Sequence, residues 1–176
     1  MVTQMTPHEL MHSGKRNFIL QQGFDDPQPK TCPNQYSSLL FQPRLVGLLA
    51  LLGVILQSPA VFLPLSALLW WSALLPRWSP FDALYNLTLG ARPDAIRLRP
   101  APAPRRFSQG MAGTFALAIG ASLLLQWTLA AFVLETFLLI AASAIIFGRF
   151  CLGSFVYYLI TGRASFAVHT LPWKQS

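Results

Sequence analysis

The sequence predicts an all-α membrane protein with four transmembrane helices in two hairpins, followed by a short interfacial or continuing helix. Charge is the first observation behind this prediction: none of the thirteen Lys and Arg residues falls in 45–76 or 107–148. Asp and Glu avoid the same stretches except at Glu135. Composition is the second, since only 11% of residues are charged, about half the usual fraction for a soluble domain. Charge is absent over such lengths only where water is absent.

The first uncharged stretch is interrupted near its middle by Gln57-Ser58-Pro59. A bilayer core of about 30 Å is crossed by roughly 20 apolar residues in a helix, and Pro is tolerated best in a helix's first turn. We therefore predict two spans, at about 38–57 and 59–76, joined by a tight turn. The alternative is one kinked span, with the remainder lying at the membrane surface.

The second uncharged stretch has its most polar interior point at Gln126-Trp127-Thr128. Trp prefers the interface between membrane and water. A second hairpin is expected there, with spans at about 107–125 and 128–148.

Three polar regions flank these spans and share one side of the membrane. They are an N-terminal tail (1–37), expected to be flexible, a Pro- and Arg-rich connection (77–106) and a C-terminal tail (161–176). Within the connection, the Pro-Ala-Pro-Ala-Pro run from Pro100 should be extended. Since all thirteen basic residues lie on this side, the positive-inside rule places both termini in the cytoplasm. The expected location is a bacterial inner membrane or a thylakoid-type membrane.

The net charge of +7 indicates an anionic partner. Basic residues beside apolar spans are typical of contact with lipid headgroups, and we assign that role to Arg77, Arg105 and Arg106. The basic residues form no stripe with interleaved aromatics, so no nucleic acid partner is expected.

Small residues recur every four positions at Ala112, Ala116 and Gly120, and again at Ala144 and Gly148. Such faces let helix backbones approach closely in a membrane. They predict helix packing, either within the chain or against a membrane-protein partner or a second copy.

Glu135 is the single ionisable residue inside a predicted span, roughly 10 Å from the start of its helix. A charge at that depth is costly, so we expect a neutral or hydrogen-bonded carboxyl. The functional interpretation is a proton or ligand site. The structural interpretation, which we favour, is a neutral Glu held by Ser, Thr or Gln of a neighbouring span.

The most distinctive local sequence surrounds Cys151, with Arg149 before it and Ser154 three residues after it. On a helix, Cys151, Ser154 and Tyr158 share one face. One hypothesis is a reactive cytoplasmic thiol assisted by Arg149; the more common case is a buried structural Cys. Because Cys32 is distant in sequence, no disulfide framework or metal site is expected.

Four short segments together resemble the bacterial and plastid membrane family catalogued as domain of unknown function 4395. The segments are Phe41-Gln-Pro-Arg-Leu-Val-Gly, Trp78-Ser-Pro-Phe, Arg106-Phe-Ser-Gln-Gly and Phe147-Gly-Arg-Phe-Cys-Leu-Gly-Ser-Phe-Val-Tyr-Tyr. The resemblance covers about 36–160 and implies a four-span fold, similar in layout to small proteins of thiol or quinone redox systems. In that family the last motif often reads Cys-x-Gly-Cys, whereas this chain has Ser154 at the second Cys position.

Three functions are therefore open. The sequence favours a non-catalytic accessory, scaffold or assembly subunit of a membrane complex, because no catalytic constellation is present. The second is a membrane component of a thiol- or quinone-linked redox system that uses Cys151. The third is proton-coupled transport through Glu135, for which the paired broken helices of many transporters are missing. No cofactor is assigned.

Overall fold

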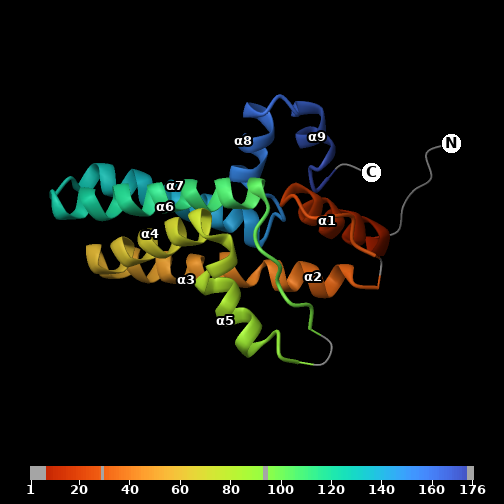
Figure 1. Cartoon of the computed structure of the whole chain (residues 1–176). Coiled ribbons are helices and arrows are strands. Elements are labelled where there is room, and N and C mark those ends of the chain that lie inside the picture. The colour runs from red at the N-terminus through yellow and green to blue at the C-terminus, as the bar shows by residue number, and fades with distance from the viewer. Residues whose placement is uncertain (1–6, 29, 93–94, 174–176) are drawn as a thin grey trace.

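The computed structural model describes residues 7–28, 30–92 and 95–173 (Figure 1), and within these residues all regular structure is helical. The elements run in the order α1 (Pro7–Gln21), α2 (Cys32–Leu39), α3 (Phe41–Leu56), α4 (Pro59–Leu74), η1 (Pro76–Trp78), α5 (Pro80–Thr88), α6 (Ala103–Leu124), α7 (Thr128–Ile146), α8 (Leu152–Ile160) and α9 (Ala164–His169).

Helices α3, α4, α6 and α7, here called the apolar helices, lie side by side (Figure 1). Helix α4 packs on α3 and α6, and α7 packs on the same two. By length and composition, three helical stretches of the described residues could cross a membrane: Cys32–Leu56, Ala103–Leu124 and Thr128–Ile146. Helix α4 is apolar but shorter.

The apolar helices begin and end close to the predicted ranges. The largest difference is at α6, which begins at Ala103 rather than near residue 107. The sequence reading used Arg105 and Arg106 as the boundary of the span, but both residues lie in the first turns of the helix. A second difference is that α2 continues almost directly into α3, with only Leu40 between them.

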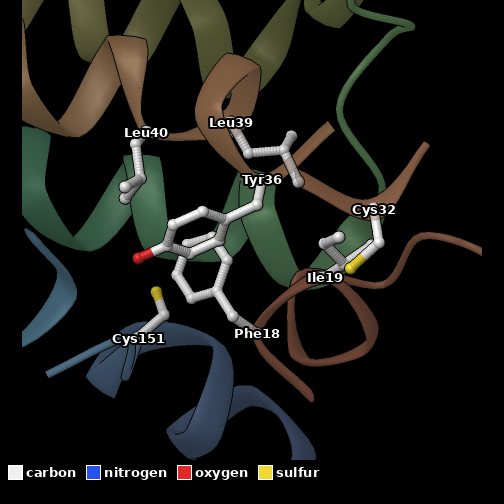
Figure 2. Packing of buried hydrophobic residues seen from close by; sticks show 7 residues of the cluster. All are labelled: Phe18, Ile19, Cys32, Tyr36, Leu39, Leu40 and Cys151. Carbon is white, nitrogen blue, oxygen red and sulfur yellow. The ribbon is translucent and has the colours of Figure 1, made fainter. Parts of the chain in front are cut away.

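The remaining helices gather at one end of the apolar helices (Figure 1), and we call this part the polar end. The sequence predicted a flexible N-terminal tail, whereas the described part of this segment forms α1 and α2, which pack together. Phe18 and Ile19 of α1 are fully buried. They join an apolar cluster (Figure 2) with Cys32, Tyr36, Leu39, Leu40 and Cys151. Burial of these side chains stabilises the fold of the tail.

The connection between α4 and α6 is also more ordered than predicted. It forms η1 and α5, and residues 95–102, which include the start of the Pro-rich run, have no regular secondary structure. Helix α5 begins with Ser79 as its N-cap, whose side chain accepts a hydrogen bond from the backbone N–H of Asp82. Such a cap satisfies one of the free amides of a helix start.

Helix α8 does not continue α7, so that alternative of the prediction was wrong. The chain turns between the two helices, and Arg149 adopts the left-handed conformation with φ 54°. Helix α8 then packs on α6. The C-terminal residues return to α1, where Asn17 Nδ2 donates a hydrogen bond to the carbonyl of Leu171 over 3.1 Å.

The two small-residue series have different outcomes. Ala116 is fully buried, and a Cβ atom on Gly120 would come within 2.7 Å of the Leu63 side chain of α4. Gly148, in contrast, lies beyond the end of α7 and is exposed. A Cβ there would meet the Ala144 carbonyl oxygen at 2.6 Å. The second series therefore marks a turn rather than the predicted helix-packing face.

The contact between α8 and α6 generates a stability prediction. A Cβ atom on Gly153 would lie 2.8 Å from the Ser108 Cα, and this backbone atom cannot rotate away. We expect Gly153→Ala to destabilise the protein by about 1–3 kcal/mol through overpacking. Gly110→Ala is the matched control, since its Cβ would meet neighbours only at 3.9 Å. Unfolding in detergent micelles measures both, and an equal loss in the two variants would contradict the prediction.

Candidate functional site

A cavity of about 190 Å³ lies where the polar end meets the apolar helices. Residues of α2, α3, α4, α6, α7 and α8 line it, together with Gln22 after α1 and Cys151 before α8. The lining divides into two chemical parts. The polar side chains are Gln22, Gln42, Arg105, Ser108, Gln109 and Cys151. Most others are apolar, including Met111, Phe115, Phe137, Leu138, Ala141 and Ile145. The cavity is therefore amphipathic.

Arg105 is the charged residue of the described lining, and only 4% of its surface is exposed. Its Nη2 donates to Gln42 Oε1 over 3.0 Å and to Asp82 Oδ1 over 3.3 Å. Its Nη1 has no hydrogen-bond partner among the described residues. The expected contact of Arg105 with lipid headgroups was therefore wrong, because its guanidinium faces the interior.

The two other basic residues assigned to headgroups are differently placed. Arg77 is exposed after α4, in a position where headgroup contact remains the prediction. Arg106 is half-buried, and its Nε donates to the Ala73 carbonyl over 2.8 Å. The side chains of the adjacent residues Arg105 and Arg106 thus lie in different surroundings.

Gln42 links the polar residues of the cavity. Its Oε1 accepts from Arg105 and also from Gln109 Nε2 over 2.8 Å. Gln109 Oε1 has no partner among the described residues. The cavity lining therefore holds one buried donor group and one buried acceptor that the described residues leave unsatisfied, and buried polar groups are normally paired.

Asp82 of α5, which is not a lining residue, contacts Arg105. Burial raises the pKa of the Asp82 carboxyl, while the charge of Arg105 and the hydrogen bond from Ser79 act in the opposite direction. Only one of its oxygens is paired, since Oδ2 has no partner among the described residues. Asp82 therefore compensates the charge of Arg105 incompletely.

Cys151 is held at the start of α8. Its backbone N–H donates to Gln21 Oε1 over 2.8 Å, and its Sγ lies 3.1 Å from Ser108 Oγ and 3.4 Å from Ser154 Oγ. The residues expected to share a face, Cys151, Ser154 and Tyr158, are all buried. The Arg149 side chain lies beside Gly14 of α1.

The two cysteines are both free and both buried. They belong to the same cluster, but Figure 2 shows Cys32 and Cys151 on opposite sides of the Phe18 and Tyr36 rings. These rings contact edge to face at 5.4 Å.

Glu135 lies outside the cavity, near the turn between α3 and α4. It is 2% exposed, and Gln57 Nε2 donates to its two oxygens over 3.0 and 3.3 Å. Gln57 ends α3 in the left-handed conformation. This contact is the one expected from the structural interpretation, a Gln of a neighbouring span. Across the described ranges, no group of three or more His, Cys, Asp and Glu residues could hold a metal ion.

Comparison with known proteins adds one assignment. A sequence profile of the family described as "Domain of unknown function (DUF4395)" matches residues 38–161. The chain belongs to this family. No curated protein and no solved structure matches this chain. The DUF4395 match includes Gln42, Arg105, Gln109 and Cys151, whereas Gln22 comes from the segment before it.

The sequence reading missed Gln42, Asp82 and Gln109. A signal for part of this set was present, since Arg105 and Gln109 are four residues apart and such residues share one face of a helix. Two polar residues on one face at the start of an apolar helix predict a polar contact inside the protein. Their partner Asp82 is too distant in sequence for any local pattern to connect it with them.

Asp82 generates a pH prediction. Because its pKa is raised in the folded protein, its contribution to stability is fully present below the unfolded value of about 3.9 and is lost as the pH rises through the folded pKa. The stability difference between wild type and Asp82→Asn should therefore fall as the pH is raised from about 4. Unfolding measured across that range tests it.

Asp26 is the control for this experiment. A hydrogen bond from Arg16 lowers the pKa of Asp26, so its contribution is present above the unfolded value and is lost as the pH falls through the folded pKa. Asp26→Asn should therefore show the opposite slope. Parallel slopes for the two variants would contradict the assignment.

Proposed function

We propose that this protein is an integral membrane protein with four spans that binds a small amphipathic ligand and acts as a non-catalytic accessory subunit. Large apolar side chains on the outside of the apolar helices support a membrane location. Examples are Ile55 (70% exposed) on α3, Leu74 (63%) on α4, and Leu129 (76%) and Phe132 (66%) on α7. A soluble protein rarely exposes so large a contiguous apolar surface.

Helix α4 is apolar but short for a membrane span. Its 16 residues give about 24 Å at 1.5 Å per residue, which is short of a bilayer core of about 30 Å. The segment that follows adds length with the single turn of η1. Trp70, Trp71 and Trp78 are exposed near this end of α4, where tryptophans anchor a span at the interface. Trp127 is exposed at the turn between α6 and α7.

With four spans, the polar end faces the cytoplasm and the two turns face the opposite side. The turns at Gln57-Ser58 and 125–127 contain no basic residue, and every Lys and Arg lies outside them. This distribution supports cytoplasmic termini. The outer surface is then free to contact lipid and a membrane-protein partner or a second copy.

Ligand binding is the function that the cavity supports best, and one observation carries it. Arg105 and Gln109 line a cavity whose remaining walls are mostly apolar, and Arg105 Nη1 and Gln109 Oε1 have no hydrogen-bond partner among the described residues. Pockets of this composition, apolar with a few convergent polar groups, are typical ligand sites. Phe137 lines the cavity yet is 58% exposed on α7, which supports access from the bilayer.

The alternatives have weaker support. A dithiol cycle needs two adjacent thiols, and Cys151 has Ser154 and Ser108 as its polar neighbours. A proton path needs a chain of ionisable groups, and Glu135 contacts the amide of Gln57 instead. Neither residue is assigned a catalytic role.

The four-span topology predicts which residues face each side. In a cysteine-free background, Ser58→Cys and Gln126→Cys should react with an impermeant maleimide added outside intact cells, because both turns face outward. Ala91→Cys, in the exposed segment after α5, should react only after permeabilisation. Labelling of positions 58 and 91 from the same side would exclude α4 as a span.

The ligand pocket predicts the outcome of a cavity-filling variant. Ala141→Phe should occupy the apolar part of the cavity, so that the protein purified in mild detergent loses a small amphipathic molecule that solvent extraction releases from wild type. Thr136→Phe is the control, because Thr136 is exposed on the same helix and does not line the cavity. Mass spectrometry of the extracts measures the difference. Equal extracts from all three proteins would contradict the proposed function.

A further inference from the structure

The chemistry of the cavity lining identifies the class of ligand. We propose that the pocket binds a single apolar chain that ends in a carboxylate, with the carboxylate on Arg105 and the chain between α6 and α7. The inference rests on the proposed function and specifies its ligand.

The charge balance around Arg105 favours an anion. Its guanidinium is almost fully buried, and its one ionic contact among the described residues is the 3.3 Å contact of Nη2 with Asp82 Oδ1. Arg105 Nη1 and Asp82 Oδ2 have no hydrogen-bond partner among these residues, so the pairing compensates the positive charge incompletely. A buried cation without a paired anion is costly. A monoanionic ligand would complete the pairing.

The geometry of the donors favours a carboxylate. Arginine presents its N–H groups in a planar fork that matches carboxylate oxygens. Nη1 is the part of this fork without a partner among the described residues. Ser108, which also lines the cavity, supplies a hydroxyl donor one turn along α6. A doubly charged phosphate would require a second cation, and Arg105 is the only Lys or Arg among the described residues of the lining.

The order of residues along α6 sets the direction of the chain. Arg105, Ser108 and Gln109 come first, and the lining residues that follow are Met111, Ala112 and Phe115. From Arg105 to Phe115 the helix rises about 15 Å. Helix α7 runs alongside with Phe137, Leu138 and Ala141. The polar head therefore lies at the level of the polar end, where the carboxylate of a membrane-dissolved chain also lies, and the apolar part extends along the spans.

The volume of the cavity limits the ligand to one chain. About 190 Å³ is below the usual 300–1,000 Å³ range of drug-sized ligand sites. A phospholipid with two acyl chains would have to leave most of its volume outside. A single-chain carboxylate of the length of dodecanoate is the probe that matches the lined length of α6.

Cys151 provides a direct readout, because its thiol lines the same cavity, whereas Cys32 does not. In the Cys32→Ser protein, reconstituted in lipid nanodiscs, the rate of Cys151 alkylation by N-ethylmaleimide is measured with dodecanoate, dodecanol or methyl dodecanoate. Dodecanoate should slow alkylation, and its affinity should exceed that of the other two probes roughly tenfold, the difference expected for a hydrogen bond to a charged group. The alcohol and the ester should have little effect.

Matched variants test the role of Arg105. Arg105→Gln should remove the protection by dodecanoate, and Arg105→Lys should retain part of it, because the charge remains while the fork is lost. Arg106→Gln, the same change on the next residue, should retain full protection, since Arg106 is outside the cavity lining. Circular dichroism and gel filtration establish that each variant is folded. Should Arg105→Gln fail to fold, the comparison of the three probes on the Cys32→Ser protein and on Arg105→Lys decides the question.

The outcomes separate this inference from the proposed function. Equal protection by dodecanol and dodecanoate would overturn the carboxylate while leaving an amphipathic-ligand site. Protection by dodecanoate that persists in Arg105→Gln would overturn the role of Arg105. No protection by any probe would overturn the inference; if Ala141→Phe also leaves the solvent extract unchanged, the proposed function fails with it.

Discussion

Burial of the Arg105 guanidinium is the constraint on which the arrangement of the polar end depends. Removing such a charge from water costs several kcal/mol after relaxation, so neighbouring segments must supply partners. Gln42 comes from α3 and Asp82 from α5, and the Phe24 ring lies 5.9 Å from the guanidinium carbon. The connection after α4 therefore has to fold back toward α6. The segment after α1 likewise has to reach the same point.

The positions of the apolar helices could be predicted from the sequence, and the polar end could not. An uncharged stretch of spanning length is a local signal, readable without knowledge of any contact. The polar end depends on pairs that are distant in the chain, such as Arg105 with Asp82 and Asn17 with Leu171. Its segments are polar and rich in turn residues, which locally favours the flexible tail that we expected. Long-range contacts, rather than local propensity, determine their folded state.

The two buried ionisable residues of the apolar helices show why charge alone is an incomplete guide. Glu135 was noticed because it interrupts an uncharged stretch, and its partner Gln57 makes it part of the packing near a turn. Arg105 was assigned to lipid headgroups because it follows a basic connection. Yet Arg105 lines the cavity, and Glu135 does not. A charge at the boundary of a span can thus line a cavity while one in its interior belongs to the packing.

The region around Cys151 also shows that the place of a residue in a sequence motif does not determine what its side chain contacts. In the resemblance to DUF4395, position 154 is often a second Cys, but here Ser154 is fully buried and accepts a hydrogen bond from Gln22 Nε2 over 3.4 Å. Its hydroxyl in turn lies 3.4 Å from the Pro104 carbonyl, at the start of α6. A side chain that a thiol pair would use for chemistry therefore joins the segment after α1 to α6 and α8. Gln22 and Cys151 both line the cavity, and Ser154, which is outside the lining, connects these two residues through its hydroxyl.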